Sequence, residues 1–405
     1  MKVLIISPCD LPVPAVQGGA VASLMESILK ENEKNKRLQI TIVTSWTSEA
    51  EKKSMLYPNV KFIWIKPVKL VSLVDSAVDI VTSKFRNKSS LPKEYARKIY
   101  VISRLKKILS EGDYDDVVVQ NSGYLLKAFK DKSIAEKYKG RIYYHLHNDI
   151  PMNADDDVLK QVKFILISRF LLKKLIVKCG KDVEKRCYIV KNGIDCEKFT
   201  RVLDKKEKSA LKKKLEIDED KKVIVFVGRI VWAKGIKELL DAIMLLNNKS
   251  VMLLIVGSTN FGAKDESEFE CEIRQRCEEL KDQVRFTGFI HNDEVWKYYK
   301  LGDVAVLPSI WEEPAGLTMI EAALSGLPVV TTYSGGIPEY LNSEYAFFIS
   351  KESNTAENIK NAVDEILSDE ARWKETGKKA SEYVMNNFSE YTFYSNFADI
   401  FDSSV

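Results

Sequence analysis

The chain has 405 residues, enough for two or three domains with a core each, so a single small domain is excluded. Hydrophobic residues make up 45% of it and charged residues 30%, which is typical of a folded globular protein and excludes a disordered or collagen-like chain. The 62 Lys and Arg residues and 58 Asp and Glu residues give a net charge of +4, which argues against a nucleic-acid binder.

The six cysteines are scattered without C-x-x-C pairs, and the chain has three histidines, so a structural zinc site is not expected. We interpret the cysteines as buried free thiols in a reducing compartment. The first apolar run is too short for a signal peptide, and no run approaches the roughly 18 apolar residues of a membrane-spanning helix. These features predict a cytoplasmic protein.

The first half of the chain alternates strand and helix patterns. An apolar, β-branched run at residues 2–7 leads into a loop with Gly18 and Gly19, and a helical pattern follows at 20–31. Further strand patterns, separated mostly by helical stretches, lie at residues 39–44, 60–65, 116–121, 141–147, 164–168 and 188–192. Apolar strands spaced by helices indicate a parallel sheet covered on both faces.

The chain turns polar and lysine-rich over residues 199–220, and we place the boundary between an N-terminal domain 1–200 and a C-terminal domain 201–380 there. Strand patterns resume at residues 222–228, 251–256, 284–287, 304–307, 328–332 and 345–349, alternating with helices such as 236–246, 268–280 and 317–324. The aromatic tail is expected to be helical, with 381–405 packing back on the N-terminal domain.

The sequence therefore predicts an α/β protein with two Rossmann-like, doubly wound parallel-sheet domains facing a central cleft. Open α/β sheets bind their ligands beyond the carboxyl ends of the strands. Candidate functional residues are therefore sought in the strand-to-helix loops.

Two cations follow the first strand of the second half. Arg229 comes directly after that strand, and Lys234 stands just before Gly235 at the start of a helix. Cations beside a helix N-terminus form a site for a diphosphate. The alternative is a pair of solvated surface cations, but the position after a central strand favours the diphosphate site.

The second cluster is the segment 308–321, with the sequence PSIWEEPAGLTMIE. Glu313 lies in its Pro- and Gly-containing loop, and Glu321 stands eight positions later in the next helix. We expect the two carboxylates to accept hydrogen bonds from sugar or ribose hydroxyls, while the amides of Gly316 to Thr318 point at phosphate. The alternative is a helix-capping glutamate and an exposed one.

These motifs together resemble glycosyltransferase family 4, and the resemblance covers essentially the whole chain. It rests on Gly228-Arg229 with Lys234-Gly235, the EPAGLTMIE segment at 313–321, GLPVV at 326–330, GGIPE at 335–339, NGID at 192–195 and the Gly18-Gly19 loop. The resemblance implies a retaining, metal-independent transferase of the GT-B fold. Its nucleotide-sugar donor would be bound mainly by the C-terminal domain.

The resemblance also implies a role for each matching residue. Arg229 and Lys234 would hold the donor diphosphate and stabilise the departing nucleoside diphosphate. Glu313 would contact the transferred sugar, and Glu321 would contact the ribose hydroxyls. The other donor-binding candidates are Gly18 and Gly19, Ile290 against the base, Ala315, and the backbone of Gly316, Leu317 and Thr318.

His145, His147 and Asn148 stand at the end of a strand of the N-terminal half and look like the histidine-bearing active-site loop of the family. We expect the two histidines to face opposite sides of the strand, so that only one reaches the cleft. We choose His147 as the catalytic one and interpret His145 as a packed core residue. Many relatives carry a histidine pair after the preceding strand, where this chain has Asn121, so Asn121 is the alternative acceptor-side contact.

No D-x-D pattern stands at a strand end, and the acidic residues 155–157 are interpreted as a solvated loop. We expect no metal and no cofactor, since the nucleotide sugar is a substrate. The family mechanism implies a same-face substitution in which the leaving phosphate oxygen assists removal of the acceptor proton.

Apolar residues at helical spacing between Leu70 and Val81 are flanked and followed by many Lys and Arg residues. Such a basic, amphipathic surface suits peripheral contact with an anionic membrane at the inner face of the plasma membrane, where a lipid-linked acceptor would be met. The alternative is a core helix followed by a solvated one.

The predicted function is transfer of a sugar from a nucleotide sugar, commonly a UDP sugar, to a glycan or lipid-linked acceptor in cell-surface polysaccharide synthesis. A nucleotide-sugar epimerase of the same fold and a non-catalytic nucleotide-sugar-binding protein are the alternatives. A dinucleotide-dependent dehydrogenase is disfavoured because Gly18-Gly19 lacks the G-x-G-x-x-G spacing. The sugar, the base and the acceptor are left open.

Overall fold

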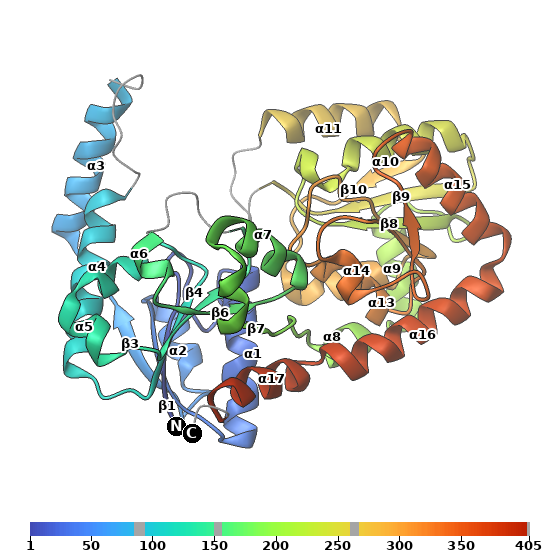
Figure 1. Ribbon diagram of the computed structural model, residues 1–405. Helices are drawn as coiled ribbons and strands as arrows, with labels where there is room; N and C mark the ends of the chain where they lie inside the picture. Colours follow the sequence, from blue (N-terminus) through green and yellow to red (C-terminus); the bar gives the residue numbers. More distant parts are fainter. Residues whose placement is uncertain (85–93, 150–155, 260–266, 403–405) are drawn as a thin grey trace. The chain divides into compact units, whose positions relative to one another are not determined.

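The computed structural model describes residues 1–84, 94–149, 156–259 and 267–402, with the side chains of 77–84 left out, and the chain forms two α/β units (Figure 1). The N-terminal unit comprises residues 1–191 and 393–405, and the C-terminal unit comprises residues 192–392. Residues 192–200, which the sequence interpretation assigned to the N-terminal domain, thus belong to the C-terminal unit. The end of the last helix belongs to the N-terminal unit.

The described part of the N-terminal unit contains one seven-stranded parallel sheet with the order β3-β2-β1-β4-β5-β6-β7. Its strands are β1 (Lys2–Ile6), β2 (Gln39–Ser45), β3 (Lys61–Ile65), β4 (Asp116–Gln120), β5 (Ile142–Leu146), β6 (Lys163–Leu166) and β7 (Cys187–Ile189). Its helices are α1 (Ala20–Asn35), α2 (Ser48–Ser54), α3 (Lys69–Lys84), α4 (Tyr95–Glu111), α5 (Lys132–Lys137), α6 (Asp156–Leu159) and α7 (Arg169–Cys179), with short 3₁₀ helices η1 (Leu125–Lys130) and η2 (Lys181–Arg186).

The described part of the C-terminal unit contains a six-stranded parallel sheet with the order β10-β9-β8-β11-β12-β13. Its strands are β8 (Lys222–Val227), β9 (Val251–Val256), β10 (Val284–Phe286), β11 (Val304–Leu307), β12 (Val329–Thr332) and β13 (Phe347–Ile349). Its helices are α8 (Cys196–Thr200), α9 (Lys205–Lys214), α10 (Ile236–Leu246), α11 (Glu268–Glu279), α12 (Val295–Tyr299), α13 (Leu317–Leu324), α14 (Ile337–Tyr340), α15 (Thr355–Ser368) and α16 (Glu370–Phe388), with 3₁₀ helices η3 (Trp232–Lys234) and η4 (Asn292–Glu294).

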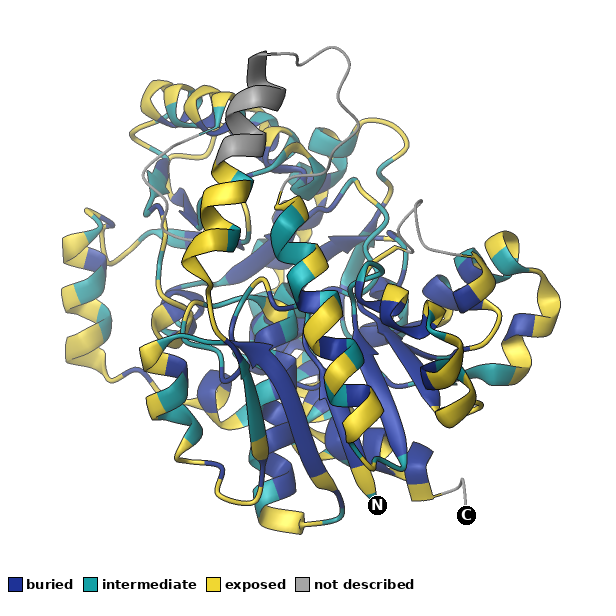
Figure 2. Cartoon of the chain, turned by 90° about the vertical axis from the view of Figure 1, so that its left-hand side faces the viewer, coloured by how far each residue is buried: buried dark blue, intermediate teal, exposed yellow. Residues whose placement is uncertain are grey.

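The central strands are buried along their whole length because helices cover both faces of each sheet. Every residue of β4, β5 and β9 is buried, which is why these strands are continuous apolar runs rather than alternating ones. Figure 2 shows the central strands of the N-terminal unit in the buried class and its helices with exposed outer sides, while the edge strands β3 and β7 are mostly intermediate. The predicted fold class, two doubly wound parallel-sheet α/β domains, is confirmed.

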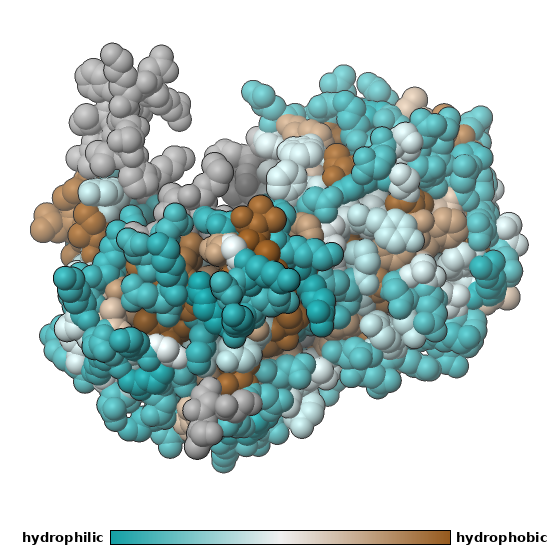
Figure 3. Space-filling view, viewed as in Figure 1, coloured by the Kyte–Doolittle hydropathy of each residue, from teal (hydrophilic) through white to brown (hydrophobic). Residues whose placement is uncertain are grey.

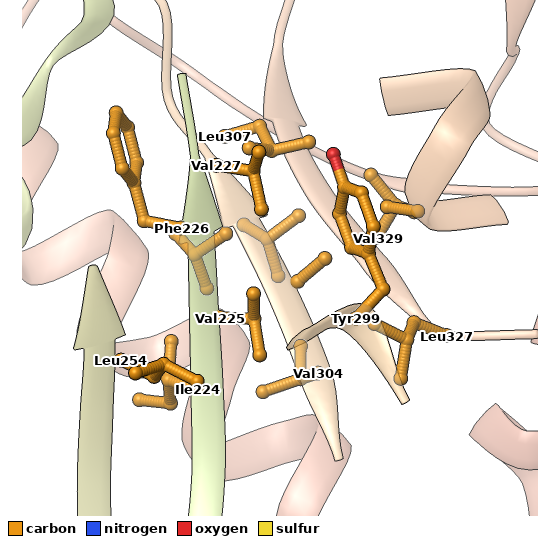
Figure 4. Packing of buried hydrophobic residues seen from close by; sticks show 14 of the residues in the cluster. Ile224, Val225, Phe226, Val227, Leu254, Tyr299, Val304, Leu307, Leu327 and Val329 are labelled. Atoms are coloured by element: carbon orange, nitrogen blue, oxygen red, sulfur yellow. The ribbon is translucent and has the colours of Figure 1, made fainter. Parts of the chain in front are cut away.

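Each unit has its own hydrophobic core. In the C-terminal unit, β8, β11 and β12 contribute Val225, Val304 and Val329 to one cluster (Figure 4). In the N-terminal unit the core includes the end of α17 (Glu390–Asp402), whose Phe397 and Phe401 are fully buried. The final helix therefore completes the N-terminal core.

All six cysteines are free. Cys9 and Cys277 are buried, as expected, but Cys271 is exposed. The expectation of uniformly buried thiols is wrong for Cys271, which lies on α11. No helix in the described part of the chain is long and apolar enough to cross a membrane.

The strand order defines one topological switch point in each sheet. In the C-terminal unit, β9 and β10 are added on one side of β8, and β11 then begins on its other side. In the N-terminal unit the same reversal lies between β1 and β4. Ligands of open α/β sheets bind beyond the carboxyl ends of the strands at such points.

Candidate functional site

Lys234 and Glu313 form an ion pair at the switch point of the C-terminal unit. Lys234 follows β8 and Glu313 follows β11, and the Nζ atom of Lys234 lies 2.5 Å from Oε1 of Glu313. The Ser309 hydroxyl donates to the same oxygen over 2.7 Å. Only 22% of the lysine side chain and 14% of the glutamate side chain are exposed. Two opposite charges are therefore held together where this fold binds ligands.

Two glycines allow the surrounding loops to approach each other. Gly235 has φ +69°, and a Cβ atom there would lie 2.0 Å from the carbonyl oxygen of Pro308. Gly335 has φ +56°, and its Cβ would lie 2.2 Å from the carbonyl oxygen of Glu313. The next amide, that of Gly336, donates to the same Glu313 oxygen over 2.7 Å. The loops after β8, β11 and β12 can meet this closely only because these positions carry no side chain.

Glu312 is a member of this loop cluster that the sequence interpretation did not single out. Its Oε2 atom accepts a hydrogen bond from the Gly335 amide over 2.6 Å, and its other oxygen pairs with Lys351 after β13. Glu312 therefore ties the loop of β11 to the loops of β12 and β13. Two consecutive glutamates in a sequence do not indicate which of the two side chains binds the neighbouring loops.

Arg229 lies on the same loop as Lys234, directly after β8, and its side chain is exposed. The sequence interpretation placed both cations on one diphosphate. The structure keeps them on one loop, with Lys234 in the ion pair with Glu313 and Arg229 open to solvent.

The start of α13 follows directly on the Glu313 loop. Ala315 is partly exposed, Gly316 is buried, and the helix begins at Leu317. The first amides of a helix, here those of Leu317 and Thr318, have no partner within the helix and carry its positive dipole end. This is the arrangement that the predicted contact of 316–318 with phosphate requires.

Glu321 lies one turn further along α13. Burial raises the pKa of its carboxyl group to about 7, against the opposing effects of a hydrogen bond from Tyr299 and the positive charge of Lys198. The Tyr299 hydroxyl lies 3.0 Å from Oε2 of Glu321. Tyr299 and Lys198 were missed from the sequence, because their partner Glu321 lies on another helix and no local pattern links them to it.

Ile290 follows β10 and is partly exposed, with part of its side chain packed against the core of the C-terminal unit. Its loop is joined to that of β9 by the Gly257 amide, which donates to the Gly288 carbonyl over 3.1 Å. Ile290 therefore lies at the same carboxyl edge of the sheet as Lys234.

The two histidines of the N-terminal unit lie on the same side of β5, with ring centroids 4.1 Å apart. The expectation that they face opposite sides is wrong, because residues two apart in an extended strand share a face. His145 is fully buried, and its ring centroid lies 6.0 Å from that of Phe397. Neither nitrogen of the His145 ring has a hydrogen-bond partner among the described residues. Burial and the neighbouring His147 lower its pKa well below the ordinary value.

His147 is 6% exposed, and its Nε2 atom lies 3.1 Å from Oε1 of Gln120. The backbone amides of His147 and Asn148 donate to Oδ1 of Asn121 over 3.0 and 3.2 Å. Asn121 adopts a left-handed conformation with φ 43°, which asparagine tolerates better than most residues. Asn121 thus fixes the histidine loop, and Asn148 is its exposed member.

Gly18 and Gly19 lie just before α1, with φ of +78° and +97°. A Cβ atom on Gly19 would lie 2.4 Å from Cδ1 of Leu11. The backbone conformation and the contact both explain why this loop carries glycine.

A broad hollow of about 460 Å³ lies at the opposite, amino-terminal edge of the N-terminal sheet, lined by Lys2, Gln39, Lys61 and Tyr114 among others. It is far from the strand ends that carry the candidate residues. Within the described residues, no three His, Cys, Asp or Glu side chains are grouped so that they could hold a metal ion. Asp155 of the predicted acidic loop lies outside the described residues.

Residues 207–383, which all belong to the C-terminal unit, match the family described as glycosyl transferases group 1. The putative glycosyltransferase YtcC of Bacillus subtilis is 25% identical over 395 residues, covering 95% of this chain and 88% of that protein. The lipopolysaccharide 1,2-N-acetylglucosaminetransferase of Salmonella typhimurium is 25% identical over 301 residues, covering 74% of each.

Solved structures of similar fold cover the chain from end to end. A glycosyltransferase from Rickettsia africae has a TM-score of 0.75 and 18% identity, covering 99% of this chain and 98% of that one. HepE of Anabaena in complex with UDP has a TM-score of 0.72 and 18% identity, covering 100% of both. The fold is that of GT-B glycosyltransferases, and the group 1 match together with the named relatives supports a glycosyltransferase.

Proposed function

We propose that this protein is a retaining, family 4 hexosyltransferase that moves a sugar from a UDP sugar to a glycan or lipid-linked acceptor, without a metal ion. The observation that carries the proposal is the partly exposed Lys234–Glu313 pair beside the N-terminus of α13, at the switch point of the C-terminal sheet. Complexes of the Anabaena protein with UDP and with UDP-glucose support the choice of donor. The name of the Salmonella relative supports a role in cell-surface polysaccharide synthesis.

The roles of the donor-site residues follow from their chemistry. Lys234 leaves Glu313 and binds the diphosphate together with Arg229 and the first amides of α13, which all carry positive charge or partial charge. Glu313, released from the lysine, accepts hydrogen bonds from the transferred sugar. Glu321 accepts them from the ribose, and Ile290 packs against the base.

The transfer step exchanges one bond at the anomeric carbon. The bond from that carbon to the leaving phosphate oxygen breaks, a bond to the acceptor hydroxyl oxygen forms on the same face, and the hydroxyl proton goes to the leaving phosphate oxygen. Lys234 and Arg229 stabilise the negative charge that develops on the diphosphate, which is the main catalytic contribution we assign to the protein.

The N-terminal unit supplies the acceptor side of the proposal. His147 is the proposed catalytic contact, with His145 as the core residue behind it and Asn121 and Asn148 as further contacts. The backbone at Gly18 and Gly19 approaches the phosphates. Because Nε2 of His147 lies against Gln120, the proposal requires this ring to turn or to act through its other edge.

The first test is thermal stabilisation by a panel of UDP, GDP, ADP and their common sugars, with and without EDTA. A rise with one nucleoside diphosphate that EDTA does not change supports both the donor site and the metal-free reaction. A rise that EDTA removes overturns the metal-free part. No rise with any of them overturns the donor-site assignment.

The Glu313→Ala variant separates an enzyme from a non-catalytic binder. Turnover should collapse, while nucleotide binding through Arg229, Lys234 and Glu321 survives in part. Analysis of the products with donor alone distinguishes an epimerase, which would return a nucleotide sugar of changed configuration. Unchanged turnover in the variant would contradict the role of Glu313.

We further propose a cytoplasmic enzyme in peripheral contact with an anionic membrane through α3. Leu70, Leu73 and Val74 on this helix are 70%, 66% and 44% exposed, and apolar side chains gather at its position in Figure 3. The apolar pattern was predicted to continue through Ala77, Val78 and Val81, whose side chains lie outside the described part of the structure. The side chains of the basic residues Lys84, Arg86, Lys88 and Lys93 lie outside it as well.

The membrane proposal is tested by sedimentation with anionic vesicles at low salt. Replacing Leu70 and Leu73 by serine should reduce the bound fraction, because apolar insertion supplies part of the affinity. Val177→Ser, at a residue that is 88% exposed on α7, is the matched control and should bind as the wild type does. Absence of wild-type binding contradicts the proposal.

A further inference from the structure

Tyr299 is a buried tyrosine whose hydroxyl group is placed between two oxygen atoms of α13. It lies 3.0 Å from Oε2 of Glu321 and 3.1 Å from the carbonyl oxygen of Thr318. The side chain is fully buried. A hydroxyl group carries one hydrogen, so it donates to one of these oxygens at a time.

The ring of Tyr299 is fixed by the core around it. Figure 4 shows it beside Val329, with its hydroxyl oxygen pointing in the direction in which β8 runs, toward the carboxyl edge of the sheet. The ring of Phe199, on α8, packs edge-on against it with centroids 6.0 Å apart. The hydroxyl group is therefore delivered to Glu321 by a rigid side chain rather than by a mobile one.

Lys198, the neighbour of Phe199, places a positive charge near the same carboxyl group. Its own side chain is 11% exposed and lies 4.0 Å from Asp293. The charged groups that act on Lys198 are Glu321, Asp293, Asp195 and Arg201. Lys198 acts on Glu321 through its charge, and Tyr299 acts on it through a hydrogen bond. Two elements, α8 and α12, thus converge on one carboxylate of α13.

We propose that Tyr299 is a positioning residue for donor binding: its hydroxyl group holds Glu321 ionised and turned so that the free carboxylate oxygen accepts hydrogen bonds from ribose. Lys198 assists through its charge. This inference rests on the proposed function, in which Glu321 meets the ribose. It assigns a role to two residues that touch no substrate themselves.

The physical reason is the conflict between burial and charge at Glu321. Enclosure disfavours the ionised form, which is the form that offers only acceptors to two vicinal hydroxyls. A protonated Glu321 would instead donate its hydrogen, and Tyr299 would turn its own hydrogen toward the Thr318 carbonyl. Donor affinity should therefore fall as the pH drops below about 7, by about tenfold for each unit once the group is mostly protonated.

The test is titration calorimetry at several pH values between about pH 5.5 and about pH 8.5. UDP-glucose, GDP-mannose and ADP-glucose are screened with the wild type, and the one that binds is used throughout, because their diphosphate diesters do not titrate in this range. Tyr299→Phe removes the hydroxyl group and keeps the ring. Its affinity should be about fivefold to tenfold below the wild type at pH 6.5 and within about twofold at pH 8.5.

Two further variants complete the design. Lys198→Met should shift the dependence of affinity on pH toward higher pH, as Tyr299→Phe does. Glu321→Gln should bind the donor weakly, with no pH dependence in this range. Tyr340→Phe is the matched control, since Tyr340 is also fully buried and its hydroxyl accepts the Asn192 amide over 2.9 Å, away from Glu321. It should lower stability and leave the shape of the profile unchanged.

Each result decides between defined alternatives. If none of the three nucleotide sugars binds the wild type, the proposed function fails and the inference fails with it. If the wild type binds, the inference alone is overturned by either of two results. The affinity of Tyr299→Phe equals that of the wild type at every pH, or it is lower by the same factor at every pH. A shift confined to low pH, shared by Lys198→Met, supports it.

Discussion

The carboxyl edges of the two sheets hold their ionisable side chains in opposite ways. In the C-terminal unit, Lys234 and Glu313 form a partly exposed ion pair on two neighbouring loops. In the N-terminal unit, the rings of His145 and His147 lie against each other beneath the surface at a tilt of 38°, and that of His145 has no hydrogen-bond partner among the described residues. The same sheet architecture thus presents a charged pair at one edge and encloses a neutral imidazole at the other.

This difference between the two edges indicates which unit supplies the charges that act in the reaction. An ion pair whose partners come from separate loops can exchange one partner for a ligand, because each side chain keeps its own anchor. A buried neutral imidazole is a packing group first, since ionising it in place costs solvation free energy. We therefore assign the reaction electrostatics to the C-terminal unit and expect His145, the fully buried histidine of the N-terminal unit, to contribute to structure.

The largest effect should come from Lys234→Met. Loss of the cation that stabilises the departing diphosphate should reduce turnover by about 10²- to 10³-fold. Lys237→Met is the matched control, because Lys237 pairs with Glu272 over 3.3 Å on the exposed side of α10. Steady-state kinetics of both variants make the measurement. A similar loss in the control would remove the distinction that we draw for Lys234.

The next largest effect is expected from replacing a glycine with positive φ by alanine, and it can be compared at one such glycine in each unit. Gly335→Ala forces a Cβ atom onto the Glu313 carbonyl, whereas Gly140, at φ +73°, has nothing within 4 Å of the added atom. Gly140→Ala should cost only the conformational penalty of about 1 to 2 kcal/mol. Gly335→Ala should cost about 3 kcal/mol or more and also weaken donor binding, since the loop must move. Urea unfolding and nucleotide titration measure the two effects, and equal costs would show that the loop contact is unimportant.

The fold could be predicted from the sequence because most buried strands contain a run of apolar, often β-branched residues. Residues 251–256 and 304–307 were expected as strands and are β9 and β11 with the same bounds. Boundaries between the units were harder to place. The segment 192–200 is joined to the C-terminal unit by contacts such as the hydrogen bond between Asn192 and Tyr340, which no local pattern records.

The candidate site was predictable only to the level of loops. Lys234 and Glu313 stand 79 positions apart, and the sequence interpretation assigned a different part of the donor to each; their mutual pairing depends on the adjacency of β8 and β11. Tyr299 was missed for the same reason, since its partner lies on another helix. The expectation that His145 and His147 face opposite sides of the strand had a different origin. Residues two apart in a strand share a face, so the sequence alone was enough to predict their correct placement.

The smallest effect concerns the pH dependence of stability in the N-terminal unit. His145 stays neutral in the folded protein because its pKa lies well below the ordinary value, while the unfolded chain takes up a proton below about pH 6.5. Acid therefore favours the unfolded state, and the free energy of unfolding should fall by up to about 1.4 kcal/mol for each pH unit below that point. His145→Phe should lose this dependence and be at least as stable at about pH 7.5, because it removes two ring nitrogens without partners. His291→Phe, at an exposed position in η4, is the control and should follow the wild type in urea unfolding at about pH 7.5 and pH 5.5. A His145→Phe curve parallel to that of the wild type would mean that this histidine takes up its proton equally in the folded and unfolded chains, and the contrast between the two edges would then be lost.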